Sequence, residues 1–225
     1  MVEEYLSDRE QEEALRSWWS ENWRWIAGGV VLGVGLLYGW NYYQSYREKQ
    51  AHLAAAQYAQ VQAALTSENA EKATAALDGL AKDFDKSAYT HEARLLVAKW
   101  HVDHGKFDEA AALLRTVMDN SPDKEVAQLA RLRLARVLLQ QGKHDETLKL
   151  LDTKTAGEFA GREREIRGDA QVAKGDMEAA RAEYAAALAG GDAQIDRPLI
   201  ELKLQEAGGT TPAAKPAQPT LPVEK

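Results

Sequence analysis

Residues 25–46 form an apolar segment that carries no charge between Arg24 and Arg47. At the rise of an α-helix this segment is ~33 Å long, close to the ~30 Å hydrocarbon core of a bilayer. Tryptophans gather before and within its first turn, and tyrosines gather towards its end. Such aromatic rings favour the headgroup level on both sides of a membrane. The pattern therefore predicts a single transmembrane helix over residues 25–46.

Two other interpretations of this segment are a cleaved export signal and a buried helix of a soluble domain. An export signal has a short basic head and small residues at its cleavage site. Here the head is acidic, and bulky residues follow the segment. A buried soluble helix normally carries a polar face, and this segment has none before Asn41. Both features favour the membrane span.

Four glycines within the segment are spaced in two pairs, Gly29 with Gly33 and Gly35 with Gly39. Glycines four residues apart let two helix backbones approach closely in lipid. We therefore take these glycines as candidates for packing against a partner's helix. The alternative is that glycine is simply common in membrane helices, and the sequence leaves both interpretations open.

Residues 1–24 form an acidic leader ahead of the predicted span. The basic residues that flank the span are too evenly divided to set its orientation by the positive-inside rule. A leader this short most easily stays in the cytoplasm, where it is synthesised. We therefore expect a cytoplasmic N-terminus and a translocated C-terminal part.

Beyond residue 47 the apolar positions follow a helical period, and a short motif recurs. It reads GKFDEA from Gly105, GKHDET from Gly142 and GDMEAA from Gly175, with a degenerate copy, ENAEKA, from Glu68. A glycine suits the left-handed end of one helix, and the acid that follows suits the start of the next. Each copy predicts a helical hairpin, and hairpins must stack to bury their apolar faces.

Residue size at fixed distances from each turn supports these hairpins. Small residues stand seven places before and five places after the turn, and a large one stands nine places after it. The three sets are Ala98, Ala135 and Gly168; Ala110, Thr147 and Ala180; and Leu114, Leu151 and Tyr184. This pattern resembles the tetratricopeptide repeat. It departs from that repeat at the head of the first helix, where Arg94, Arg131 and Arg164 replace a large residue, and at His101, where an aromatic is common.

The fold class we expect is all-α, a single N-terminal transmembrane helix followed by a tetratricopeptide-like α-solenoid of stacked helical hairpins. The predicted parts are a cytoplasmic leader over 1–24, the span over 25–46, the repeat domain over 47–207 and a disordered Pro-rich tail over 208–225. The tail lacks apolar periodicity and is rich in proline, so a solvated end is expected; a peptide ligand for a partner is the alternative.

The whole layout resembles the YfgM family of ancillary SecYEG translocon subunits. The resemblance rests on the leader REQEEALRSWWSENW, the glycine-rich span, the segments YYQSYREKQ and AAAQYAQVQAAL, and the weak repeats that follow. It implies an anchor in the bacterial inner membrane with periplasmic repeats. It also implies association with the SecYEG translocon and with a periplasmic chaperone of the PpiD type.

Charge and composition narrow the function further. The net charge is −7, which disfavours a nucleic-acid partner, and the absence of cysteine excludes disulfides and thiolate chemistry. No catalytic or phosphate-binding motif is present, so we expect neither an enzyme nor a cofactor. His101 and His104 are spaced as a metal pair, but their places in the repeat favour one packed and one surface histidine.

If the hairpins stack, the first helix of each lines a concave surface. We predict that this surface contains Lys99, Arg136 and Asp169, each six places before a turn, with Glu92 and Arg162 nearby. These five residues form the predicted partner-binding groove. The sequence thus predicts a membrane-anchored interaction scaffold that links the translocon to periplasmic chaperones or emerging polypeptides. The alternative is a membrane-tethered regulator of envelope assembly or stress that acts through its cytoplasmic leader.

Overall fold

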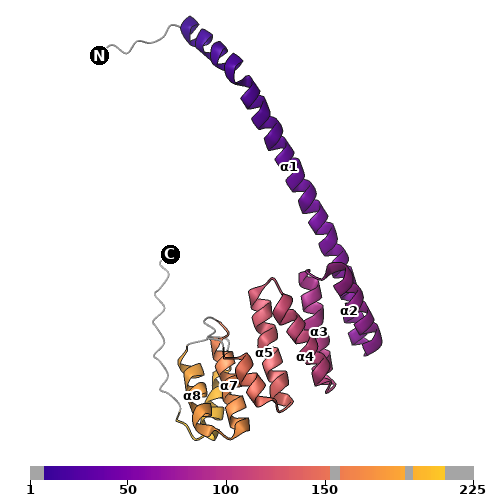
Figure 1. Cartoon of the computed structure of the whole chain (residues 1–225), viewed down its shortest axis with the longest axis vertical. Coiled ribbons are helices and arrows are strands. Elements are labelled where there is room, and N and C mark those ends of the chain that lie inside the picture. Colours follow the sequence, from indigo (N-terminus) through magenta and orange to yellow (C-terminus); the bar gives the residue numbers. More distant parts are fainter. Residues whose placement is uncertain (1–7, 153–157, 191–194, 211–225) are drawn as a thin grey trace, which may run out of the picture. The chain divides into compact units, whose positions relative to one another are not determined.

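The chain is all-helical in the computed structural model, which describes residues 8–152, 158–190 and 195–210. The predicted tail therefore lies outside the described residues from residue 211 onward. The chain divides into two compact units, Met1–Leu53 and Ala54–Lys225. The helices of the described part (Figure 1) are α1 (Asp8–Thr66), α2 (Ala70–Phe84), α3 (Ala88–Asp103), α4 (Phe107–Asn120), α5 (Lys124–Gln140), α6 (His144–Leu150), α7 (Ala160–Lys174), α8 (Met177–Ala189) and α9 (Arg197–Glu206).

The described part of the first unit is α1 up to Leu53, and the predicted span lies within it. Between residues 11 and 53 no residue is buried. Large apolar side chains are exposed along this helix; Val31 is 72% exposed and Leu37 is 71% exposed. None of the helices in the described part of the chain combines the length and apolar character needed to cross a bilayer. The transmembrane helix predicted over 25–46 is therefore not confirmed.

The second unit is built from the predicted hairpins, and a left-handed residue ends the first helix of each. The backbone φ is +72° at Gly105, +73° at Gly142 and +82° at Gly175. In the degenerate copy Glu68 takes the same place with φ +51°. One hydrogen bond recurs in all four turns, from the amide after the left-handed residue to the carbonyl five residues back. Its donor–acceptor pairs are Asn69 to Ala64, Lys106 to His101, Lys143 to Leu138 and Asp176 to Gln171, at 2.8–3.0 Å.

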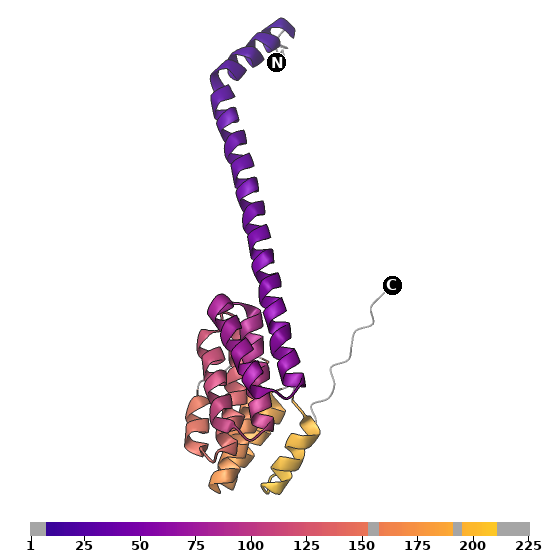
Figure 2. The same cartoon turned by 90° about the vertical axis from the view of Figure 1, so that its right-hand side faces the viewer.

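Consecutive hairpins pack through shared core clusters, which confirms the tetratricopeptide-like solenoid. The C-terminal part of α1 packs with α2 and α3 through Val61, Leu80 and Val97. Another cluster joins α3, α4 and α5, a third joins α5 to α7, and a fourth joins α8 to α9. Figure 1 shows the helices from α2 to α8 following one another along this unit in chain order, and Figure 2 shows α9 beside the α7–α8 hairpin.

The small residues around the turns are buried, as their spacing predicts. Ala98, Ala135, Ala110 and Ala180 are each no more than 1% exposed. Thr147, the exception in the middle copy, is fully buried, and its hydroxyl donates to the Lys143 carbonyl at 3.0 Å. Because this bond satisfies the hydroxyl, threonine fills an alanine position without leaving a buried polar group unpaired.

The α7–α8 hairpin uses a different pair of residue sizes at the same two positions. Tyr184 takes the place of Leu114 and Leu151, and its ring lies against Gly168. A Cβ at Gly168 would lie 2.4 Å from the nearest ring carbon of Tyr184. The larger side chain on α8 is therefore accommodated by the missing side chain on α7.

The arginines that replace the large residue at the head of each first helix all form ion pairs. Arg94 donates to Asp85 at 2.5 Å, Arg131 to Glu163 at 3.0 Å, and Arg164 to Glu183 at 3.3 Å. The Arg94 hydrogen bond lowers the pKa of the Asp85 carboxyl. Arg131 and Glu163 are both largely shielded from solvent and connect α5 to α7. At these positions an ion pair thus replaces the apolar contact that a large side chain makes in the usual tetratricopeptide repeat.

The substitution Glu68→Gly tests the left-handed turn of the degenerate copy. A side chain in this conformation costs about 1 kcal/mol, which glycine avoids. We expect the thermal midpoint of the full-length protein, followed by circular dichroism, to rise by roughly 2–4 °C. Glu68→Gln removes the same charge but keeps the backbone cost, so it should give no such rise. Equal gains from both variants would contradict the assignment.

The substitution Gly168→Ala tests the contact with Tyr184. We expect it to lower the free energy of unfolding by about 1–3 kcal/mol, because the new methyl group overlaps the ring. The double variant Gly168→Ala/Tyr184→Leu recreates the alanine–leucine combination of the α3–α4 and α5–α6 hairpins and should recover part of that loss. Gly79→Ala is the control, because its Cβ meets no atom within 4 Å and a helix interior favours alanine by about 0.5–1 kcal/mol. Additive effects of the Gly168 and Tyr184 substitutions would disprove the compensation.

Candidate functional site

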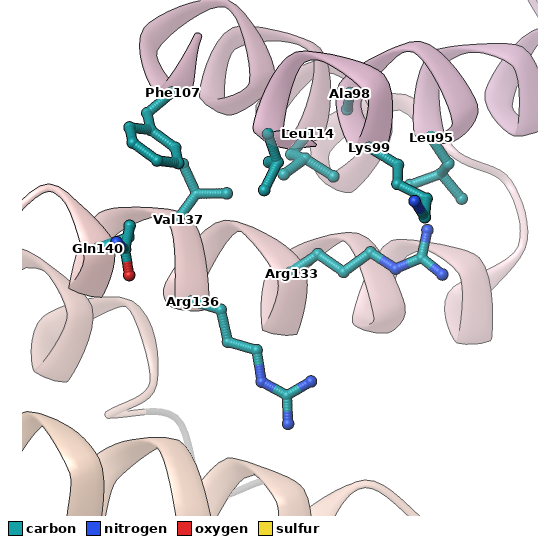
Figure 3. A pocket seen from close by; sticks show the side chains of 10 residues that line it. Leu95, Ala98, Lys99, Phe107, Leu114, Arg133, Arg136, Val137 and Gln140 are labelled. Atoms are coloured by element: carbon teal, nitrogen blue, oxygen red, sulfur yellow. The ribbon is translucent and has the colours of Figure 1, made fainter. Parts of the chain in front are cut away.

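A groove of about 560 Å³ lies between the α3–α4 hairpin and α5 (Figure 3). Lys99 comes to it from α3 and Arg136 from α5. The structure therefore brings two of the five predicted groove residues to one site. Their positions follow from the repeat, since both stand six places before a left-handed glycine. We call this hollow the α3–α5 groove; its lining residues are Leu95, Ala98, Lys99, Val102, Phe107, Leu114, Arg133, Arg136, Val137 and Gln140.

The floor of the α3–α5 groove is apolar and continuous with the hydrophobic core. Leu95, Leu114 and Val137 are 8%, 2% and 5% exposed and belong to the cluster that joins α3, α4 and α5. Phe107 and Val102 are partly buried against the same cluster. Because these side chains are anchored by the core, the groove has a preformed surface that a ligand's apolar side chain can contact.

The charged groups of the groove are all basic. Lys99 is exposed and pairs with Asp103 on its own helix at 2.6 Å, and Arg136 pairs with Glu165 of α7 at 3.5 Å. Arg133 has no ion-pair partner among the described residues. Partial desolvation and then the nearby charge of Arg136 lower the pKa of the Arg133 guanidinium, which stays protonated.

Arg133 is a groove residue that the sequence analysis missed. It lies one helical turn before Arg136, and residues three apart share a helix face. The same place in the other hairpins holds Leu96 and Ile166, so a comparison of repeats treats it as a core position. The signal in the sequence that could have identified Arg133 is its spacing of three residues from Arg136.

The other predicted groove residues lie elsewhere in the repeat unit. Glu92 is exposed near the start of α3, and Arg162 is partly buried at the start of α7. Asp169 lines a separate hollow of about 270 Å³ with Tyr184 and Lys203. The roles of these three residues in partner binding stay predictions.

Asp169 takes part in a network that fastens α9 to α7. Lys203 of α9 donates to Glu165 at 2.8 Å and to Asp169 at 2.9 Å, and the Tyr184 hydroxyl donates to Asp169 at 2.7 Å. Burial and the bond to Asp169 raise the pKa of the Tyr184 phenol. Burial opposes the charge of Lys203, but the bonds to the two carboxylates outweigh it and raise the Lys203 pKa. The network therefore has a structural role that the sequence analysis did not foresee.

The two histidines of α3 have separate environments. His101 is buried, and its desolvation lowers its pKa. His104 is exposed and stacks on Trp100, with ring centroids 3.8 Å apart. Within the described residues, no group of three or more potential metal ligands is found.

The glycines proposed for helix packing lie in the open part of α1. A Cβ added at Gly29, Gly33, Gly35 or Gly39 would meet no atom within 4 Å. No side chain of the described chain therefore occupies the space beside them, and their role in packing stays a prediction.

Comparison with known proteins identifies the family. A family model described as a tetratricopeptide repeat-like domain matches residues 16–209. A protein of Haemophilus influenzae named ancillary SecYEG translocon subunit is 33% identical over 202 residues, covering 89% of this chain and 98% of that protein. Its namesake in Escherichia coli is 33% identical over 185 residues, covering 82% of this chain and 89% of that protein. Among solved structures, MamA 41-end from Desulfovibrio magneticus is similar with a TM-score of 0.49 and 17% identity, covering 71% of this chain and 89% of that one.

The similarity to these relatives runs along nearly their whole length. The family model begins at residue 16, so its match includes the apolar segment of α1 as well as the hairpins. The names of the relatives describe a subunit of a translocon, and none of them names a catalytic activity. The repeat architecture, the turn positions and this similarity agree. The chain belongs to the tetratricopeptide repeat-like family of ancillary SecYEG translocon subunits, the YfgM family.

Proposed function

We propose that this protein is a membrane-anchored interaction scaffold that associates with the SecYEG translocon. The observation that carries the proposal is the exposed apolar surface of α1 in a chain whose relatives are named as translocon subunits. Contiguous apolar surface on this scale is rare on a soluble monomer and indicates contact with lipid or another protein. The repeats then supply the surface that holds a partner.

The anchor that we propose is a single span over residues 25–46. From residue 25 to Trp40 its exposed side chains are apolar or aromatic, among them Leu32, Leu36 and Trp40 at 66%, 66% and 67% exposure. Lipid would cover this surface on all sides, and a helix satisfies its own backbone hydrogen bonds there. Glycine and aromatic residues make the segment less hydrophobic than a leucine-rich span, and they suit packing against helices of the translocon.

In this proposal the leader, residues 1–24, is cytoplasmic, and the repeat domain, residues 47–207, is in the periplasm of a bacterial inner membrane. One span confines the repeats to the membrane surface and raises their effective concentration near other membrane components. The repeats then link the translocon to a periplasmic chaperone of the PpiD type or to an emerging polypeptide. The α3–α5 groove is the proposed contact surface, because it combines a preformed apolar floor with basic side chains.

Charged substitutions within α1 test the anchor. We expect the wild-type protein to stay with the membrane pellet after alkaline carbonate washing. Leu32→Asp/Leu36→Asp places two acids near the middle of the proposed span, each costing about 2.5–3.5 kcal/mol, and should move the protein into the supernatant. Leu53→Asp changes an exposed leucine beyond the span (55% exposed) and should leave it in the pellet. Release of the wild-type protein by carbonate would refute the anchor.

Charge reversal in the groove tests partner capture. In site-specific photocrosslinking from the repeats, we expect Lys99→Glu/Arg136→Glu to reduce crosslinks to periplasmic partners by roughly tenfold, because both cations line the proposed contact surface. Lys72→Glu/Lys82→Glu reverses two exposed lysines of α2 outside the groove and serves as the control. Equal crosslinking by wild type and the groove variant would remove the α3–α5 groove from the contact surface. Copurification with the tagged translocon tests the association itself.

A further inference from the structure

We propose that residues 11–24 of α1 form an interfacial helix that lies along the membrane surface, with one tryptophan-rich face in the headgroup layer. This inference rests on the proposed single span and adds a second contact with the membrane, ahead of that span. The face consists of four large side chains of the leader, Leu15, Trp18, Trp19 and Trp23. We call it the tryptophan face.

The residues of the tryptophan face share one side of α1. At 100° per residue the four side chains span an arc of ~140°. The opposite side is polar, and within an arc of ~80° it carries Glu13, Ser17, Glu21 and Arg24. On this side the Ser17 hydroxyl donates to the Glu21 carboxylate at 3.5 Å. The leader is therefore an amphipathic helix, whereas the proposed span that follows it is apolar.

The tryptophan face is exposed in the structure. Its side chains range from 48% exposed at Trp23 to 66% exposed at Leu15. The backbone is helical throughout, because α1 continues from the leader into the proposed span. Several large apolar side chains gathered on one exposed face indicate contact with lipid or with another protein. The chemistry and the position of the face decide between these two partners.

Lipid is the partner that this face fits. An indole ring joins a large apolar surface to an N–H donor, and both are satisfied at the headgroup level of a membrane. Trp23 stands two residues before the start of the proposed span, so the face begins at the depth of the membrane surface. A helix that is charged on its other side stays out of the hydrocarbon core and lies in the plane of the interface.

The course of α1 agrees with a leader that lies along the surface. Figure 2 shows the N-terminal end of α1 turning away from the axis of the rest of this helix. A straight continuation of the span would carry residues 11–24, which are ~20 Å long at helical rise, away from the bilayer. The change of direction lets the tryptophan face lie against the membrane instead.

The charges of the leader contribute little to this contact. Residues 11–24 contain three acids, Glu12, Glu13 and Glu21, and two bases, Arg16 and Arg24. Interfacial helices that bind through charge carry many lysines and arginines on their polar side, and this helix does not. The aromatic rings therefore supply the attraction. We expect the contact to form on neutral lipid and to resist salt, which screens only the electrostatic part.

Site-directed spin labelling of the full-length protein tests this inference. The chain contains no cysteine, so one introduced cysteine carries the nitroxide label. In phosphatidylcholine vesicles, relaxation of the label by oxygen, which concentrates in lipid, is compared with relaxation by a water-soluble nickel chelate. We expect the label at Leu15→Cys to favour oxygen, also at high salt, and the label at Ser17→Cys on the polar side to favour the nickel chelate.

A variant without the aromatic rings tests their role in the same protein labelled on the tryptophan face. The triple substitution is Trp18→Ser/Trp19→Ser/Trp23→Ser. It should reverse the preference of the label from oxygen to the nickel chelate, because the attraction to lipid is lost. The control Glu13→Gln/Glu21→Gln changes the polar side and should leave the oxygen preference intact. An oxygen preference that survives the triple substitution would overturn the inference.

A label within the span separates this inference from the proposed anchor. Leu32→Cys should favour oxygen whenever residues 25–46 cross the bilayer. If the label at Leu15→Cys favours the nickel chelate as strongly as the label at Ser17→Cys, the interfacial helix is overturned, because lipid alone does not cover its face. A lipid-like label at Leu32→Cys in that experiment shows that the anchor stands without it. A water-like label at Leu32→Cys overturns the anchor and the interfacial helix together.

Discussion

The architecture of the repeat unit depends on one backbone constraint, the left-handed residue that closes the first helix of each hairpin. The amide that follows it bonds to the carbonyl five residues back, in all four turns. This bond ends one helix and starts the next in the opposite direction within three residues. The distances from the turn then fix which side chains face each other. Lys99 and Arg136 each stand six residues before such a turn, so they occupy equivalent positions on α3 and α5. Their place in the lining of the α3–α5 groove therefore follows from the position of the turns.

Within this frame, each hairpin solves the packing between its helices in its own way. The α3–α4 and α5–α6 hairpins pack alanine with leucine in one cluster, and the α7–α8 hairpin packs Gly168 against Tyr184. The arginines at the helix heads add polar contacts, of which the largely shielded Arg131–Glu163 pair joins α5 to α7. Since desolvation offsets much of the attraction in such a pair, we interpret its main effect as fixing the register of α5 against α7. Divergent repeats can therefore keep one architecture with different contacts.

The sequence predicts those parts of the structure that depend on local rules. Turn positions, hairpin helices and small core residues follow from periodicity and from glycine, and even Glu68 was located by its distance from Gly105. The parts of the structure that the sequence does not predict depend on contacts between repeats. Arg133 was missed because Leu96 and Ile166 occupy the equivalent places, and α9 was missed because it lies outside the repeat motif. Asp169 was assigned to the groove from its register, whereas Lys203 of α9 and the Tyr184 hydroxyl contact it.

The fastening of α9 has a consequence for how the array loses structure. In a linear stack each repeat is supported by its neighbours, so the last one has support on one side only and opens most readily. Here α9 covers the α7–α8 hairpin with Ile200 and Leu204, and Lys203 reaches the two acids of α7. The terminal hairpin thus has support on both sides. Its amide hydrogens would then exchange with solvent as slowly as those of an internal repeat, which shifts fraying away from this end of the solenoid.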